Sequence, residues 1–266
     1  LAHPLVRAIS FVGSSPVAKY VYQTAAAHGK RVQALGGAKN HLVVMPDANI
    51  EKSVEAIMGS AFGAAGERCL AGSVLVAVGD SRPLLDALLT KVHALRIGDG
   101  AAPDTDMGPL VTADHRRRVV GYIEKGVAEG AQLLVDGRTR MDGDGFFLGP
   151  TVFDRVTPDM TIAREEIFGP VLSVIHVKDL DEAIALVNSS AFGNTTSIFT
   201  ADGKSAREYA SRIEVGMVGV NIGVAAPMAF FPFSGWKNSF FGDLHAHGRD
   251  AVAFYTEQKV IMTRWV

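Results

Sequence analysis

The chain has 266 residues, and its 48% hydrophobic content is enough to bury a large core in one large domain or two smaller ones. Its 26 basic residues nearly balance 28 acidic ones, with no long basic block and no apolar run of membrane-spanning length, which argues against nucleic acid and membranes as partners. A single cysteine cannot form an internal disulfide, and no Cys-x-x-Cys pair suggests zinc, so we expect a reducing, cytoplasmic setting and no metal.

The first predicted elements are a strand, a turn and a helix. Residues 8–12 are apolar and read as a buried strand, and Gly13-Ser14-Ser15-Pro16 then supplies a turn, a serine N-cap and a proline for the first helical turn. The helix should run to about His28 and end at Gly29. Backbone amides at the start of such a helix can bind phosphate oxygens, but the same strand, turn and helix occur in every α/β protein, so this signal is weak alone. Because the sequence begins at Leu1 in mid-pattern, we expect more protein upstream.

A glycine pair, Gly36-Gly37, precedes the next predicted strand at Leu42–Met45. Such a pair lets the backbone run close to a flat ligand, and it equally suits an ordinary bulge or turn.

The only cysteine follows a predicted helix that begins at Ile50. One helical face carries residues at spacings of four, three, four and four, namely Val54, Met58, Ala61, Ala65 and Cys69. We therefore expect Cys69 to emerge where the packed helix gives way to the glycine-flanked segment Gly66–Gly72. A free cysteine is usually a small buried hydrophobe. Here the glycines leave room for a ligand, and the cation of Arg68 can favour the reactive thiolate, so Cys69 is a candidate nucleophile.

Downstream, helices and strands alternate. We expect a strand at 73–78, a helix at 83–95, a loop at 97–110, a helix at 113–129, a strand at 132–135, a turn at 142–145, a strand near 149–153 and a second α/β unit over 181–220. The aromatic loop 230–242 should pack on a substrate tunnel or a neighbouring subunit. The terminal segment 259–266 reads as a strand that pairs between subunits.

The histidines offer weaker signals. We interpret His28, His93, His115 and His176 as surface or core residues rather than ligands. Asp243, His245 and His247 could bind a metal, but a polar loop explains them better.

Five motifs occur in an order that resembles the aldehyde dehydrogenase superfamily: Phe11-Val12-Gly13-Ser14, Leu35-Gly36-Gly37, Gly66-x-x-Cys69, Glu165-Glu166-Ile167-Phe168-Gly169-Pro170-Val171 and the Phe-Pro-Phe-Ser-Gly loop at 231–235. Residues 37–41, 46–48 and 61–69 are similar to the CoA-acylating methylmalonate-semialdehyde dehydrogenases. The resemblance implies the C-terminal portion of such an enzyme and an α/β fold. It assigns residues 1–35 to the end of a doubly wound NAD-binding domain, 36–235 to an α/β catalytic domain, and 236–266 to a return segment and oligomerisation strand of a homodimer or homotetramer.

The resemblance also implies roles for single residues. Cys69 would be the catalytic nucleophile, and its backbone amide an oxyanion donor. Arg68 would bind the substrate carboxylate, for which a guanidinium fork is suited. NAD would be the cofactor. Ser14 would lie at its pyrophosphate and the Gly36 backbone near its nicotinamide ring. Glu166 would lie at a ribose, and Phe168 beside the nicotinamide end.

One departure from the family pattern bears on the reaction. Hydrolytic members carry a water-activating glutamate just before Leu-Gly-Gly, and here that position is Ala34. A thioester that water attacks poorly would persist until a thiolate such as that of coenzyme A arrives. We therefore expect NAD-dependent, CoA-acylating oxidation of malonate or methylmalonate semialdehyde to acetyl-CoA or propionyl-CoA, as in valine or inositol catabolism.

Three alternatives stay open. Another residue could activate water in a hydrolytic aldehyde dehydrogenase. The chain could be a catalytically silent fragment that serves assembly through its terminal strand and aromatic loop. A Cys/His hydrolase could use Cys69 with His41, although one downstream histidine is thin support.

Overall fold

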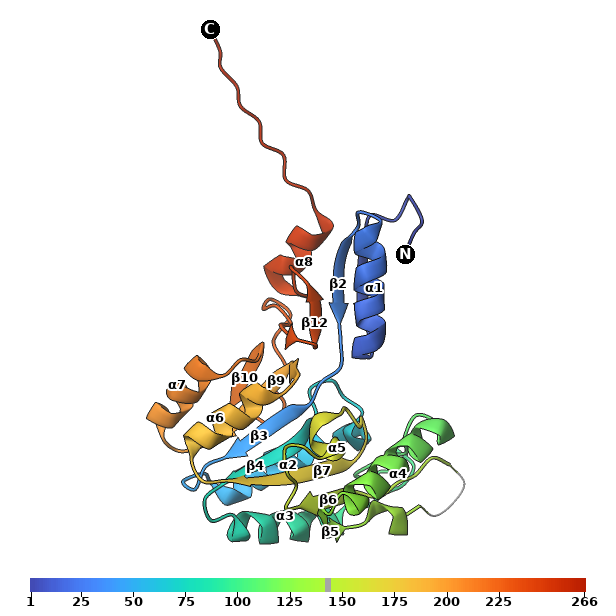
Figure 1. Ribbon diagram of the computed structural model, residues 1–266, viewed down its shortest axis with the longest axis vertical. Helices are drawn as coiled ribbons and strands as arrows, with labels where there is room; N and C mark the ends of the chain where they lie inside the picture. The colour runs from blue at the N-terminus through green and yellow to red at the C-terminus, as the bar shows by residue number, and fades with distance from the viewer. Residues whose placement is uncertain (142–144) are drawn as a thin grey trace.

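The strands form three sheets in the computed structural model, which describes residues 1–141 and 145–266. The largest sheet has seven strands, in the order β10 (Met217–Val220), β9 (Thr195–Phe199), β3 (Asn40–Val44), β4 (Gly72–Val78), β7 (Val171–Val177), β6 (Thr151–Asp154) and β5 (Gln132–Val135). All neighbours pair in parallel except β5 and β6. Figure 1 shows this sheet in the lower body and a smaller sheet above it.

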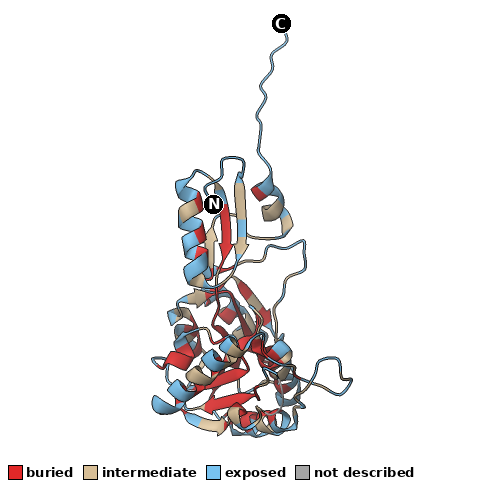
Figure 2. Ribbon diagram, turned by 90° about the vertical axis from the view of Figure 1, so that its right-hand side faces the viewer, coloured by how far each residue is buried: buried red, intermediate tan, exposed pale blue. Residues whose placement is uncertain are grey.

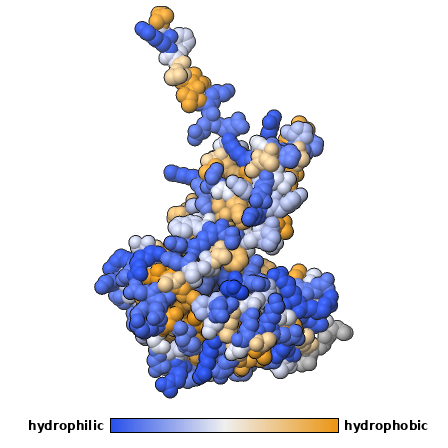
Figure 3. All heavy atoms as spheres, in the orientation of Figure 1, coloured by the Kyte–Doolittle hydropathy of each residue, from blue (hydrophilic) through white to orange (hydrophobic). Residues whose placement is uncertain are grey.

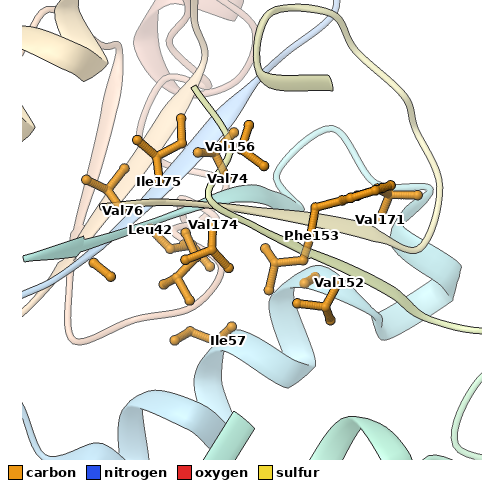
Figure 4. Packing of buried hydrophobic residues seen from close by; sticks show 14 of the residues in the cluster. Leu42, Ile57, Val74, Val76, Val152, Phe153, Val156, Val171, Val174 and Ile175 are labelled. Atoms are coloured by element: carbon orange, nitrogen blue, oxygen red, sulfur yellow. The ribbon is translucent and has the colours of Figure 1, made fainter. Parts of the chain in front are cut away.

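Helices connect the parallel strands, since parallel neighbours need long crossover connections. These are α2 (Ile50–Ala61), α3 (Arg82–Ala94), α4 (Ala113–Ala128), α5 (Thr161–Arg164), α6 (Leu180–Ser189) and α7 (Gly203–Arg212). All five residues of β3 are buried, as expected for a strand covered on both faces. Figure 4 shows Ile57 of α2 pointing toward side chains of the sheet such as Val174. Burying each such side chain stabilises the fold by about 1.5–3 kcal/mol.

The smaller sheet joins the two ends of the chain. Strand β1 (Ala8–Val12) pairs in parallel with β2 (Arg31–Leu35), and β12 (Phe240–Gly242) pairs antiparallel with the other edge of β2. Helix α1 (Ser15–Ala27) packs on this sheet, and α8 (Gly248–Tyr255) lies beside it (Figure 1). A two-stranded sheet of β8 (Phe192–Gly193) and β11 (Trp236–Lys237) completes the set. The proposed boundaries at residues 35 and 235 stay predictions, but strand pairing groups residues 8–35 with 240–242.

Most elements predicted from the sequence are confirmed within a few residues, including the helix over 113–129 and the α/β unit over 181–220. Strand β1 was expected to be buried, and this is wrong: its residues are half-buried or exposed, because it forms an edge of the small sheet. The turn predicted at 142–145 falls largely on residues 142–144, outside the described part of the chain.

The helix that precedes Cys69 is shorter than predicted. Helix α2 ends at Ala61, and the chain continues through a 3₁₀ turn (η1, Gly63–Gly66) in which Ala64 and Ala65 adopt left-handed φ angles of 50° and 52°. The expectation that one helical face continues to Cys69 is therefore wrong. The buried face includes Ile57, whereas Met58 is only half-buried.

The C-terminal segment has no strand assignment after α8. It extends away from the body (Figures 1 and 2), and hydrophobic residues are visible along it in Figure 3. Val260, Ile261, Met262 and Trp265 are each at least three-quarters exposed. Pairing of this segment between subunits stays a prediction. In the aromatic loop, Phe230 and Phe231 are also exposed. No described helix is long and apolar enough to cross a membrane.

Candidate active site around Cys69

Cys69 lies in the connection between η1 and β4, and its side chain is exposed. The chain approaches it through Gly66, whose φ of 71° is in the left-handed region. A Cβ atom at this position would lie 2.8 Å from the carbonyl carbon of Gly169. Glycine is therefore required at position 66 both by its backbone conformation and by the close approach of the 169 backbone.

The structure brings five of the six predicted site residues into one cleft of about 300 Å³. Its walls come from the β1–α1 turn, the glycine pair after β2, the cysteine loop, the start of α4 and the segment before β7. The lining residues are Val12, Gly13, Ser14, Gly36, Gly37, Cys69, Val111, His115, Arg118, Glu166 and Phe168. Only Arg68, of the residues predicted for the site, does not line this cleft.

Although Cys69 remains accessible to solvent, its partial burial in the cleft desolvates the thiol and raises its pKa above the ordinary value. The backbone N–H groups of Cys69 and Leu70 favour the thiolate and lower the pKa, while the Glu166 carboxylate raises it further. The Arg68 cation also lowers it, as predicted, but has the smallest of these effects. Arg68 thus favours the thiolate in the predicted direction, but desolvation outweighs the nearby cation and the net pKa of Cys69 is raised.

The Arg68 guanidinium is turned toward the C-terminal end of α2. Its Nη2 donates to the carbonyl oxygen of Gly59 and, at 2.9 Å, to that of Ser60. These carbonyls lie near the end of a helix, where cationic side chains are favourable partners. Arg68 lines a separate small cavity of about 20 Å³, which shares Glu166 and Phe168 with the Cys69 cleft. Its binding of a substrate carboxylate stays a prediction.

Glu166 contacts the glycine-pair segment directly. Its Oε1 accepts a hydrogen bond of 2.9 Å from the Ala38 amide. A Cβ atom at Gly37 would lie 2.9 Å from the carboxyl carbon, so the carboxylate takes this position only because residue 37 has no side chain. Burial raises the pKa of Glu166, while the Ala38 amide and the cations of Arg118 and Lys39 oppose the shift.

Phe168 is held in an unusual backbone conformation at the edge of the cleft. Its φ of 61° is left-handed, which is costly for a non-glycine residue. Nε2 of His115 lies 2.6 Å from the Phe168 carbonyl oxygen and 3.3 Å from Oε1 of Glu67. The interpretation of His115 as a surface or core residue rather than a ligand stays a prediction, and it did not include this contact. Its place in the first turn of α4 carried no signal of a contact made 53 residues away.

The first turn of α1 faces the same cleft. Ser14 is the N-cap of α1, but its side chain makes no capping hydrogen bond. Its neighbour Ser15 instead ties the chain together, since its hydroxyl accepts from the Gly37 amide at 2.9 Å and donates to the Asn238 carbonyl at 2.6 Å. A Cβ atom at Gly36 would lie 2.7 Å from the Ser15 hydroxyl. Because Gly36 has no side chain, the end of β2 can pack directly against Ser15 of α1 and the backbone at Asn238.

The geometry counts against a Cys/His hydrolase. His41 is buried in β3, where burial and the nearby Lys39 cation lower its pKa to about 3. It lines a different cavity, together with residues such as Ile175 and Leu186. His41 and Cys69 therefore do not share a site.

The Asp243, His245 and His247 segment also has a different arrangement from a metal site. The His245 ring stacks on Phe240 with 4.3 Å between ring centroids, and its Nδ1 lies 3.4 Å from Asp250. Over residues 1–141 and 145–266, no group of three or more histidine, cysteine, aspartate or glutamate side chains is arranged to hold a metal ion.

Comparison with known proteins agrees with the observed fold. The model of the aldehyde dehydrogenase family matches residues 1–261. The chain is 56% identical to malonate-semialdehyde dehydrogenase 1 of Geobacillus thermodenitrificans over its whole length, and it spans 55% of that protein. It is also 56% identical to a malonate-semialdehyde dehydrogenase of Pseudomonas aeruginosa, of which it spans 54%.

Solved structures give the same result. A methylmalonate-semialdehyde dehydrogenase from Oceanimonas doudoroffii superposes with a TM-score of 0.97 at 48% identity, over 100% of this chain and 55% of that one. A proposed methylmalonate-semialdehyde dehydrogenase from Sinorhizobium meliloti, complexed with NAD, superposes with a TM-score of 0.98 at 48% identity, with the same coverage of both chains. The chain thus spans just over half the length of these relatives, and its correspondence to their C-terminal portion stays a prediction. The family model, the identities and the shared α/β architecture together show that this chain belongs to the aldehyde dehydrogenase family.

Proposed function

We propose that this chain carries the nucleophile of a CoA-acylating, NAD-dependent dehydrogenase of malonate or methylmalonate semialdehyde. The observation that carries this proposal is the exposed Cys69 thiol in one cleft with the Gly36-Gly37 pair, Glu166 and Phe168. The names of the relatives support the semialdehyde substrate, and the NAD complex of the Sinorhizobium meliloti protein supports the cofactor.

The residues of the cleft fit a dinucleotide. The free Ser14 hydroxyl and the first amides of α1 suit a pyrophosphate, because the N-terminus of a helix favours anions. The Gly36 backbone lines the cleft, where a flat ring could lie against it, and the Glu166 carboxylate can accept from ribose hydroxyls. NAD bound there would supply the acceptor for a hydride. Phe168 would lie beside its nicotinamide end.

In the proposed reaction the Cys69 sulfur attacks the aldehyde carbon, and the Cys69 amide donates to the developing oxyanion. Hydride loss from the resulting thiohemiacetal leaves a thioester on Cys69. The carboxylate β to that thioester is lost as carbon dioxide, because the electron pair delocalises into the thioester carbonyl. The resulting enolate then takes a proton from solvent at the α-carbon. Acyl transfer from Cys69 to the CoA thiol then releases acetyl-CoA or propionyl-CoA.

Transfer to CoA rather than water is supported by Ala34. This residue is fully buried in β2, among apolar residues of α1 such as Ala18 and Val21, and it does not line the cleft. It therefore supplies no group that could activate water. A hydrolytic dehydrogenase remains the second candidate, because Glu166 and His115 both line the cleft and can exchange protons.

Product analysis on the complete protein separates the two candidates. With a semialdehyde and NAD but no CoA, we expect a stoichiometric burst of NADH that then stops, and sustained turnover to the CoA ester when CoA is added. Sustained NADH production with release of free acid in the absence of CoA would overturn the CoA proposal. The Cys69→Ser variant is the control, and it should lose the burst.

We also propose that the complete protein is a cytoplasmic homodimer or homotetramer whose contacts include the exposed C-terminal segment. The apolar side chains there support this, since they are buried by nothing in the described chain. Light scattering on the complete protein, with and without residues 257–266, tests the proposal. An unchanged oligomer after deletion would contradict it, and a stable oligomer without any dehydrogenase activity would favour a role in assembly alone.

A further inference from the structure

The carbonyl oxygen of Cys69 is held by two side-chain amides from distant parts of the chain. Nδ2 of Asn40 donates to it at 2.9 Å, and Nδ2 of Asn194 donates at 2.8 Å. Asn40 is the first residue of β3, and Asn194 joins β8 to β9. Both side chains belong to buried residues, 3% and 5% exposed. Both lone pairs of this loop carbonyl are thus used by side-chain donors.

The two asparagines are themselves fixed by neighbouring strands. Asn40 also donates to the Ala71 carbonyl at 2.8 Å, and its Oδ1 accepts from the Thr195 amide at 3.3 Å. The Asn194 carbonyl accepts from the Met217 amide of β10 at 3.1 Å. The donors therefore sit on the parallel sheet, and the cysteine loop is attached to a rigid base. Buried hydrogen bonds of this kind gain strength from the low local dielectric.

The planarity of the peptide links this attachment to the sulfur. The Cys69 carbonyl and the Leu70 N–H belong to one trans peptide, so they point in opposite directions. Fixing the oxygen toward Asn40 and Asn194 therefore also fixes the direction of the Leu70 N–H, a group that lowers the pKa of the Cys69 thiol. Donors on the carbonyl also polarise the same peptide and make its N–H a better donor.

We propose that Asn40 and Asn194 are positioning residues that hold the Cys69–Leu70 peptide so that its N–H faces the sulfur, and that they thereby set the reactivity of this thiol. The inference rests on the proposed function, because it takes Cys69 as the nucleophile. Neither asparagine needs to touch substrate or cofactor in this role.

Asn194 is the sharper probe, since its side chain makes one described hydrogen bond, to Cys69, whereas Asn40 makes several. The Asn194→Leu variant removes the donor and keeps the number and branching of the side-chain heavy atoms. In the complete protein, alkylation of Cys69 by iodoacetamide is followed against pH, with peptide mapping to identify the labelled cysteine. We expect the rate at pH 7.5 to fall roughly five- to tenfold, the size of one net hydrogen bond, and the pH profile to move upward.

The control is Asn188→Leu, because Asn188 also bridges two backbone groups, the Arg212 carbonyl and the Glu214 amide, but does not contact the cysteine loop. Its alkylation profile should match the parent. If Asn194→Leu does not fold, Asn194→Asp tests the same point, since it is isosteric and replaces the donor with an acceptor. In the NADH burst, Asn194→Leu should slow the rate and leave the KM for NAD unchanged.

An unchanged alkylation profile in both Asn194 variants would overturn the proposal. The alkylation assay needs no aldehyde, NAD or CoA, so it reports on the asparagines even if the semialdehyde substrate is incorrect. The proposed function fails separately, by retention of dehydrogenase activity in Cys69→Ser or by the absence of NADH from either semialdehyde.

Discussion

Nε2 of His115 lies 2.6 Å from the carbonyl oxygen of Phe168, and this contact joins the first turn of α4 to a residue with a left-handed φ of 61°. The same nitrogen lies 3.3 Å from Glu67, two residues before Cys69. One imidazole therefore connects the cysteine loop, α4 and the strained turn before β7. The strain at Phe168 persists only because its surroundings favour it.

Replacing His115 with leucine should release the Phe168 turn. We expect the free energy of unfolding to fall by about 1 kcal/mol, the net value of one hydrogen bond, and the KM for NAD to rise roughly fivefold if Phe168 lies beside the nicotinamide. Chemical denaturation and steady-state kinetics on the complete protein measure the two effects. His93→Leu, on the exposed side of α3, is the matched control. Parent-like stability and kinetics in His115→Leu would show that the contact is incidental.

A methyl group at Gly37 should displace the Glu166 carboxylate, because an added Cβ would lie 2.9 Å from its carboxyl carbon. We expect Gly37→Ala to weaken NAD binding and to lower the free energy of unfolding by only about 1 kcal/mol, the low end for overpacking, because only the end of a flexible side chain has to move. Gly121→Ala is the control, since a Cβ there meets nothing within 4 Å and alanine should favour α4 by up to about 1 kcal/mol. Thermal unfolding and NAD titration of both variants decide the matter, and equal behaviour would be evidence against the steric argument.

Glu166→Gln tests whether the carboxylate binds the cofactor. The amide keeps the shape of the side chain but loses the charge, so charge-assisted hydrogen bonds to ribose hydroxyls would weaken and the KM for NAD should rise roughly tenfold. Stability should be kept or slightly increased, because burial already raises the pKa of this carboxyl and so disfavours its ionised form. Glu165→Gln is the control, since Glu165 is exposed and accepts from Tyr122. An unaltered KM in Glu166→Gln would reject the ribose role.

The raised pKa of Cys69 predicts a specific pH dependence. A thiol whose folded pKa lies above its unfolded value keeps its proton in the native state, so its stabilising contribution is present below the unfolded pKa and is lost as pH rises through the folded pKa. The free energy of unfolding should therefore fall as pH rises through the thiol range, and Cys69→Ser should reduce that slope. Alkylation of the parent should keep accelerating with pH beyond the range of an ordinary thiol. A plateau near neutral pH would contradict the shift.

The order of strands and helices could be predicted because its signals are local. Proline and serine near the start of α1, Gly29 after its end and the apolar run of β4 act through neighbouring residues. Strand β12 could not be placed in the same way. It pairs Phe241 with Ala34 in the middle of the small sheet, and no local pattern specifies a partner so distant in the chain.

The residues of the candidate site also separate into those predictable from local sequence and those placed only by folding. The single cysteine between glycines, the Gly36-Gly37 pair and the Glu166 to Phe168 motif are properties of short segments, so the sequence by itself determined these candidates and the absence of a glutamate at Ala34. Only the tertiary structure decided that Arg68 turns to the end of α2, that His115 supports Phe168, and that two asparagines hold the Cys69 carbonyl. The physical reason is that hydrogen-bond partners and the desolvation of a thiol depend on atoms brought close by folding, across 29 to 125 residues of chain, and no spacing along the sequence encodes those distances.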